Sequence, residues 1–227
     1  GDIGIAVAKR LVAEGYSVLL HYHNNLQAIQ SLVQEFPDEN ILGIIHGDLS
    51  NDNGIKRFLD KLNFPIGNVI FTSGKSEYNL FQHTSEKTMD EMITLHVKAP
   101  WMITKHIIPN LVQESFGKII LITSIWGEVG ASCEVIYSSV KGAQNSFVKA
   151  LAKELAPNGI SVNAVSPGFI ETKMNNIFSN KEKIDIINEI PMNRAGHPDE
   201  VAHVVSFLLD NRSSYVQGEI INVTGSW

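Results

Sequence analysis

The sequence predicts an α/β protein, a doubly wound parallel sheet with helices on both faces, built as a single domain over residues 1–227. Short β-branched runs alternate with longer segments of helical period, which is typical of repeated β-α units. Some runs, such as 117–122, are apolar on both faces, as in strands of a sheet covered on each side. The chain length suits one core rather than two.

The predicted elements follow from this alternation in chain order. Strands are expected at Ser17–Tyr22, Ile41–His46, Asn68–Thr72, Lys118–Thr123, Ile160–Val165 and Glu219–Val223. Helices are expected at Ile5–Glu14, Lys87–Gln113 and Val135–Ala156, and the two long ones suggest a homo-oligomer, a tetramer or a dimer. A polar excursion from Glu171 to Asn193 lies between a strand and a helix, so 171–197 is expected to form a substrate lid.

The first four residues, Gly1-Asp2-Ile3-Gly4, resemble the end of a glycine-rich turn that runs into a helix. Such a turn normally follows a strand. We therefore expect the natural protein to have a first strand that this sequence lacks.

Composition excludes several classes of function. A net charge of −6 without a basic stripe argues against nucleic acid as a partner. A single cysteine, Cys133, rules out an intrachain disulfide and a cysteine-based metal site, and it suits a reducing compartment, so a cytoplasmic protein is expected. No apolar run reaches the length of a membrane span and no export signal is visible, so a membrane is not expected to be a partner. No metal is expected either.

The chemistry is concentrated at Ser124, Tyr137 and Lys141. A tyrosine and a lysine four positions apart lie on one face of a helix, where an ammonium can lower the pKa of the phenol from about 10. Ser124 ends an apolar strand, at the sheet edge where open α/β folds bind ligands. Taken alone, a tyrosine and a lysine at this spacing on a helix, or a serine at the end of a strand, are common by chance. Their order and placement together predict a carbonyl reductase in which Tyr137 is the acid and Ser124 holds the carbonyl oxygen.

The chain resembles the short-chain dehydrogenase/reductase family over nearly its whole length. The matching motifs are Gly1–Gly4, Gly47-Asp48-Leu49, the set Ser124, Tyr137 and Lys141, the run Asn163–Gly168, and the ending Gly218–Gly225. The resemblance implies a Rossmann-type fold and a nicotinamide dinucleotide. It also implies a cofactor site made of Gly1, Ile3, Gly4, Tyr22, His23, Asn24, Asp48, Leu49, Ser73, Gly74, Tyr137, Lys141, Pro167, Gly168, Ile170 and Thr172.

Three positions depart from the family pattern. His96 stands where the family usually has an asparagine of the proton relay; a histidine titrates near neutrality, so His96 is either a catalytic residue of a different relay or part of the core. Phe71-Thr72-Ser73-Gly74 keeps only the glycine of the usual Asn-Asn-Ala-Gly. Asp2 falls where a glycine of the turn is usual.

The end of the second expected strand bears on the choice of cofactor. His21-Tyr22-His23-Asn24-Asn25 carries no acid that would bind the ribose diol of NAD and repel a phosphate. NADPH is therefore favoured over NADH. The alternative is that these residues are merely polar surface before a helix.

The substrate is expected to be a ketone, either a small molecule or one carried by a protein. The family includes 3-oxoacyl-[acyl-carrier-protein] reductases, which makes acyl carrier protein one candidate partner. The run Ser124–Glu134 followed by Val140–Ser146 resembles the bacterial subgroup that reduces a 5-aminopentanone group on a lysine of elongation factor P.

The residues expected to line the substrate pocket are Ser124, Trp126, Cys133 and Glu134. Glu134 stands one turn before Tyr137, where it can pair with an amine on the substrate or simply favour the helix start. Cys133 lacks histidine and acid partners, so we expect it to pack against its neighbours or line the pocket rather than to act as a nucleophile. A rival from another class is a non-catalytic dinucleotide-binding or scaffold protein, against which the complete Ser, Tyr and Lys set argues.

Overall fold

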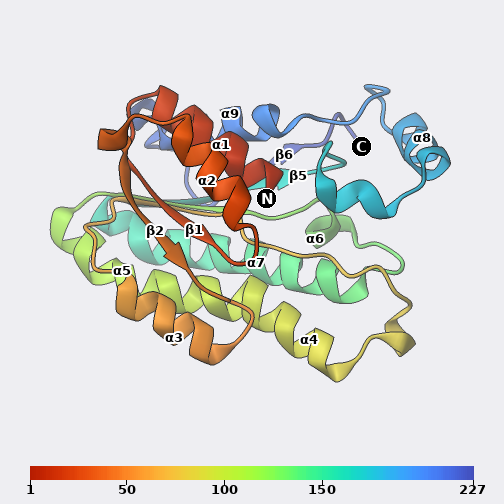
Figure 1. Cartoon of the computed structure of the whole chain (residues 1–227), viewed down its shortest axis with the longest axis horizontal. Coiled ribbons are helices and arrows are strands. Elements are labelled where there is room, and N and C mark those ends of the chain that lie inside the picture. The colour runs from red at the N-terminus through yellow and green to blue at the C-terminus, as the bar shows by residue number, and fades with distance from the viewer.

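The computed structural model describes all residues from 1 to 227 and contains six strands, every pairing of which is parallel (Figure 1). β1 (Val18–Tyr22) pairs with β2 (Ile41–His46). The other block has the order β3 (Asn68–Phe71), β4 (Gly117–Ile122), β5 (Ile160–Pro167), β6 (Ile220–Val223). The predicted fold class and all six predicted strands are confirmed.

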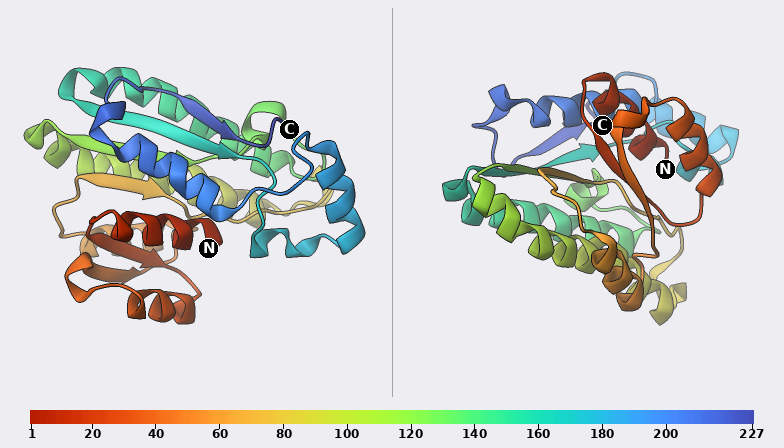
Figure 2. Two further views of the ribbon diagram at one scale, coloured as in Figure 1. Left: turned by 90° about the horizontal axis from the view of Figure 1, so that it is seen from above. Right: turned by 60° about the vertical axis from the view of Figure 1, so that its left-hand side comes forward.

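Helices cover both faces of the strands. On one side lie α1 (Asp2–Ala13), α2 (Leu26–Gln34) and α9 (Pro198–Leu209), and on the other α3 (Asp52–Lys61), α4 (Glu86–Ile93), α5 (Ala99–Glu114) and α7 (Val135–Leu155) (Figure 1). The right-hand view of Figure 2 shows the same layers. None of these helices combines the length and apolarity that a membrane span requires.

The side chains of β4 point alternately toward the two helical layers and so belong to two separate core clusters. Ile119 and Leu121 belong to the core cluster that includes α5 and α7, whereas Ile120 and Ile122 belong to the cluster formed with α1 and α9. All four side chains are buried, at 0–7% exposure. A strand with both faces covered needs an unbroken apolar run, which is what residues 119–122 supply.

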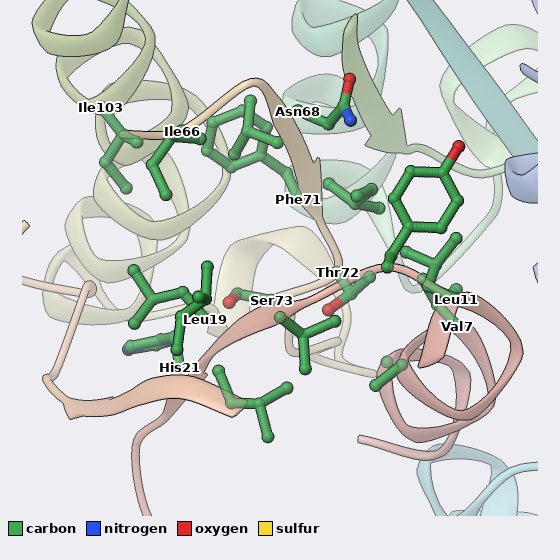
Figure 3. A pocket seen from close by; sticks show the side chains of 18 of the residues that line it. Val7, Leu11, Leu19, His21, Ile66, Asn68, Phe71, Thr72, Ser73 and Ile103 are labelled. Atoms are coloured by element: carbon green, nitrogen blue, oxygen red, sulfur yellow. The ribbon is translucent and has the colours of Figure 1, made fainter. Parts of the chain in front are cut away.

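The two blocks of strands are separated by a cavity of about 320 Å³ that lies between the edges of β1 and β3. Most of its lining is apolar, and Figure 3 shows side chains that point into it from several elements, among them Val7, Leu11, Leu19, Ile66, Phe71 and Ile103.

The long helix predicted at Lys87–Gln113 is not α-helical throughout. α4 passes through a π-helical segment, η3 (Thr94–Lys98), before it continues as α5. A π segment widens the helix by one residue and is often found at functional sites. Here it carries His96.

The predicted lid region, 171–197, consists of the short 3-10 helix η5 (Lys173–Ile177), the helix α8 (Asn180–Glu189) and their connections. A capping box between Ser179 and Glu182 starts α8. Asp2 fixes the other end of this region, because its carboxylate accepts a hydrogen bond from the backbone N–H of Lys173 at 2.6 Å.

A short helix, α6 (Trp126–Val129), packs against α7 through a glycine. A Cβ atom at Gly127 would lie 2.7 Å from the carbonyl carbon of Lys141 and 2.9 Å from the backbone nitrogen of Gly142. Only a residue without a side chain permits this contact, which holds Trp126 beside the helix that carries Tyr137.

We predict that Gly127→Ala destabilises the protein by about 1–3 kcal/mol, the usual cost of overpacking a close contact. Gly142→Ala is the matched control, since its Cβ would approach only the Gly127 carbonyl oxygen, at 3.3 Å, and alanine favours helix. Denaturant unfolding of both variants measures the difference. Equal stabilities would contradict this description of the α6–α7 contact.

Candidate active site

The carboxyl end of β4 and the first turns of α7 bring Ser124, Tyr137 and Lys141 together. Ser124 follows β4, and Tyr137 and Lys141 share one face of α7. The Ser124 hydroxyl hydrogen-bonds the Tyr137 phenol. It also accepts a hydrogen bond from the backbone N–H of Trp126 at 3.2 Å, which fixes its position. The three side chains line one cavity of about 150 Å³.

Lys141 is enclosed by protein and makes one hydrogen bond. Its side chain is 4% exposed, and Nζ donates to the backbone carbonyl of Ile122 at 2.8 Å. Nζ lies 5.5 Å from the centroid of the Tyr137 ring. No carboxylate pairs with it, so burial lowers the pKa of Lys141 to about 7. The lysine therefore exchanges its proton near neutral pH.

The pKa of Tyr137 differs from the expectation that Lys141 would lower it. Burial raises the pKa of this phenol to about 12, and the charge of Glu134 adds to the rise, while the hydrogen bond with Ser124 opposes it. Lys141 does not offset burial because its ammonium is directed to the carbonyl of Ile122. In this structure Tyr137 is a fully protonated acid at neutral pH.

His96 lies at the back of the site and is completely buried, at 0% exposure. Its Nε2 lies 2.9 Å from the Lys75 carbonyl oxygen, and its ring meets that of Tyr137 edge-on with centroids 5.7 Å apart. Nδ1 has no hydrogen-bond partner. Burial, with the nearby Lys141 charge, lowers the pKa of His96 to about 3, so His96 is neutral and does not titrate near pH 7 as the sequence suggested.

Most residues predicted to bind the cofactor surround the same cavity. Its lining includes Ile3, Ser73, Gly74, Pro167, Gly168, Ile170 and Thr172. Gly1 and Gly4 line the neighbouring apolar cavity instead. Tyr22, His23, Asn24, Asp48 and Leu49 lie at the ends of β1 and β2, outside the catalytic cavity.

The residues predicted to line the substrate pocket also lie partly inside and partly outside the catalytic cavity. Trp126 and Glu134 line the catalytic cavity with Ser124, but Cys133 does not. Cys133 takes a left-handed backbone conformation, φ 63°, and its carbonyl accepts a hydrogen bond from the Asn79 N–H. It therefore has a role in turning the chain into α7.

The residues at the mouth of the cavity fit a nicotinamide dinucleotide. The first turn of α1 reaches the cavity at Ile3, and free amide groups of a helix start favour phosphate. Gly4 allows this approach, since a Cβ there would lie 2.8 Å from Thr72 Oγ1. The carboxylate of Asp2, which would repel phosphate, is bound to the Lys173 N–H.

Comparison with known proteins gives a match over residues 2–225 to the family model described as "Enoyl-(Acyl carrier protein) reductase". The chain belongs to the short-chain dehydrogenase/reductase family. It is 42% identical to "Uncharacterized oxidoreductase YmfI" of Bacillus subtilis, over 100% of this chain and 95% of the relative. It is 32% identical to the 3-oxoacyl-[acyl-carrier-protein] reductase FabG of Aquifex aeolicus, over 98% and 92%, and 29% identical to that of a Staphylococcus epidermidis strain, over 98% and 93%.

As a short-chain dehydrogenase/reductase the chain is an NAD(P)H-dependent oxidoreductase, which confirms the predicted enzyme class. Its residues provide no group of three or more His, Cys, Asp or Glu side chains arranged to hold a metal ion.

Sequence reasoning missed several residues that line this cavity. Trp227 packs its ring on Trp126 with centroids 4.8 Å apart, and Phe169 and Phe178 extend the wall toward the lid. These side chains come from segments far from the catalytic motif in the chain. An aromatic residue two positions after the matching Gly218–Gly225 segment was the only available sign.

We predict that Lys141 makes the stability of the cofactor-free enzyme depend on pH. Between about pH 7 and 10.5 the folded lysine is neutral while the unfolded one is charged, so the unfolded state binds more protons and stability rises with pH. The unfolding free energy of the wild type relative to Lys141→Met should then increase by up to about 1.4 kcal/mol per pH unit in this window.

Denaturant titrations at pH 7, 8 and 9 provide the measurement. Lys105→Met, on the exposed side of α5, is the control and should show no such trend. A difference that is flat or falls with pH would mean that Lys141 is charged in the folded enzyme.

Proposed function

We propose that this short-chain dehydrogenase/reductase reduces a ketone with NADPH and that Tyr137 donates the proton. The observation that carries the proposal is the Ser124–Tyr137 hydrogen bond beside the buried Lys141, in a cavity of about 150 Å³. This set makes the rival hypothesis, a non-catalytic dinucleotide-binding or scaffold protein, the weaker one.

The bound cofactor supplies a hydride to the carbonyl carbon. Ser124 donates a hydrogen bond to the carbonyl oxygen and orients it. Tyr137, whose pKa of about 12 keeps it protonated at neutral pH, gives its proton to the same oxygen as negative charge develops there. Lys141 is the nearest cation to the resulting phenolate, and with its pKa near 7 it can return a proton. The same lysine holds the ribose of the nicotinamide.

His96 is proposed to position these groups rather than to carry charge. The shorter of its two Nε2 contacts, 2.9 Å to the Lys75 carbonyl against 3.3 Å to the Lys75 N–H, favours the tautomer in which Nε2–H donates to that carbonyl, and Nδ1 is then an acceptor without a partner. The Gln144 side chain donates to the His96 carbonyl at 2.7 Å and ties the π-helical segment to α7. His96 thus fixes the tilt of the Tyr137 ring through their edge contact.

We predict that Tyr137→Phe lowers kcat by at least about 10²–10⁴-fold, the contribution expected of a general acid, with the cofactor Kd largely kept. Ser124→Ala should lower kcat less, because Tyr137 still provides the proton. Tyr215→Phe is the control, since Tyr215 is 100% exposed. NADPH oxidation with generic ketones measures all three, and an active Tyr137→Phe enzyme would refute the proposal.

The preference for NADPH rests on the end of β1. Tyr22, His23 and Asn24 carry no carboxylate themselves. The nearby carboxylate of Asp48, 3.8 Å from His23 Nε2, is engaged by the Ser50 hydroxyl and the Asn51 amide, each at 2.7 Å. His23 is half-exposed and its ring stacks on that of His46 with centroids 6.5 Å apart. Both imidazoles can donate hydrogen bonds to a phosphate. Asp48 is proposed to contact the adenine.

We predict that the enzyme binds NADPH more tightly than NADH and that His23→Asp reverses the order, because a carboxylate repels the 2′-phosphate and accepts the ribose diol. Nucleotide fluorescence titration gives both Kd values. His203→Asp, an exposed position on α9, should leave the ratio unchanged. Equal affinity of the wild type for the two cofactors would exclude this role of His23.

Two ketones are proposed as substrates. The run Ser124–Glu134 with Val140–Ser146 favours the 5-aminopentanone group on elongation factor P, while relatives named 3-oxoacyl-[acyl-carrier-protein] reductase favour an acyl ketone on acyl carrier protein. A direct comparison of the modified elongation factor with a 3-oxoacyl thioester separates the two.

The proposal includes assembly and location. Ile93 on α4 and Trp101 on α5 are about half exposed, at 50% and 48%, and supply apolar surface for a homo-oligomer, a dimer or tetramer. A cytoplasmic location is part of the same proposal.

A further inference from the structure

We propose that His23 and His46 bind the 2′-phosphate of NADPH and take up a proton as they do so, which makes the affinity for NADPH, but not for NADH, fall as the pH rises. The inference rests on the use of NADPH proposed above and names the regulation of that same site. It follows from three features of the β1–α2–β2 unit: its lack of permanent cations, the paired imidazoles at its end, and a carboxylate beside them.

The β1–α2–β2 unit has no permanently charged cation of its own. No lysine or arginine occurs between Arg10 and Lys56, and all three elements lie within that interval. In the proposed NADPH complex the adenosine ribose lies at the end of β1, where dinucleotide-binding folds usually recognise a 2′-phosphate with an arginine. Here the only side chains of the unit that can become cationic are His21, His23 and His46.

Two of these imidazoles lie side by side at the carboxyl ends of the two strands. His46 is the last residue of β2, and its ring contacts the Tyr22 ring at a centroid distance of 5.1 Å. On the His23 ring it stacks at 6.5 Å, with the two planes only 29° apart. Both histidines are exposed. This spacing leaves room for one phosphate group to accept a hydrogen bond from each ring, since an N–H···O bond spans about 2.7–3.2 Å.

The other ionisable groups around the pair leave its charge undecided. His21 Nε2 lies 2.8 Å from the Gly47 carbonyl oxygen, and burial lowers the pKa of His21, so this third imidazole stays neutral. α2 carries no ionisable side chain. At the start of α3 the Asp52 carboxylate is paired with Lys98 at 2.7 Å. The charge of the site therefore depends on the two exposed imidazoles and on one further carboxylate.

That carboxylate belongs to Asp48, whose Oδ1 lies 3.8 Å from His23 Nε2. A 2′-phosphate at His23 would bring a second anion, with a charge of about −1.5 to −2 near pH 7, to the same imidazole. Two adjacent anions favour the protonated form of an imidazole over its neutral form. Because histidine side chains exchange their protons between about pH 5 and 8, filling the site draws a proton from the solvent at neutral and alkaline pH. NADH brings no phosphate to this place and needs no such proton.

The first test compares the Kd values of NADPH and NADH at pH 6.5, 7.5 and 8.5 by nucleotide fluorescence at constant ionic strength. The free 2′-phosphate is already largely dianionic in this range, so its own ionisation does not mask the effect. Uptake of one proton weakens binding by up to about tenfold per pH unit. We expect the Kd of NADPH to rise at least about tenfold over the two units and that of NADH to change less than about twofold.

Substitutions of the two histidines show whether they are the source of the effect. His23→Gln and His46→Gln, whose amides donate hydrogen bonds but do not titrate, should each reduce the pH dependence and together remove it. His23→Lys should bind NADPH tightly at both pH 6.5 and pH 8.5, because a lysine stays charged throughout this range.

His203→Gln, at an exposed position on α9, is the matched control and should keep the full pH dependence. The inference would be overturned by a ratio of NADPH to NADH affinity that is constant with pH in the wild type. A pH dependence that survives in the double variant would overturn it as well.

A calorimetric measurement separates this inference from ketone reduction. Adenosine 2′,5′-bisphosphate is titrated into the enzyme at pH 7.5 in two buffers that differ in their enthalpy of ionisation, which counts the protons taken up on binding. We expect about one proton for the bisphosphate, none for AMP, and none for either ligand in the double variant. If the proton is taken up but no ketone is reduced, the inference stands and the proposed function fails. If ketones are reduced with NADPH but no proton is taken up, the inference fails and the function stands.

Discussion

The burial of Tyr137 beside Lys141, at the carboxyl end of a parallel sheet, is the constraint on which the rest of the site depends. Neither group has an opposite charge to pair with, so each is held in or near its neutral form: the pKa of the phenol is raised to about 12 and that of the ammonium is lowered to about 7. The site therefore stores a proton on an acid and places beside it a base that can replace the proton near neutral pH.

The surrounding fold supplies this environment through a few close contacts. Gly127 lets α6 rest on α7 at Lys141, and the π-helical segment directs the His96 ring against Tyr137. The room for that ring is narrow, since a Cβ at Gly74 would lie 3.0 Å from His96 Cε1. Excluding water in this way is what keeps His96 and Tyr137 uncharged.

Much of the fold could be predicted from the sequence, because each strand is specified by a local and largely apolar run of residues. The Ser124, Tyr137 and Lys141 set could be found for a similar reason, since its spacing on one strand end and one helix is local. The direction of the Tyr137 pKa shift was predicted wrongly. It depends on where the Lys141 ammonium points, which is decided by the Ile122 carbonyl on a different element. Trp227 was missed because only the tertiary fold brings it to Trp126.

The most direct test of this account is an ultraviolet titration of Tyr137 in the cofactor-free enzyme. Tyrosinate absorbance is followed from pH 7 to the onset of unfolding, and the curve of Tyr137→Phe is subtracted from that of the wild type. The account predicts no difference signal up to pH 10, because burial keeps this phenol protonated well beyond the range of ordinary tyrosines. A difference signal with its midpoint near pH 8 would contradict it, since Lys141 would then govern the ionisation of the phenol.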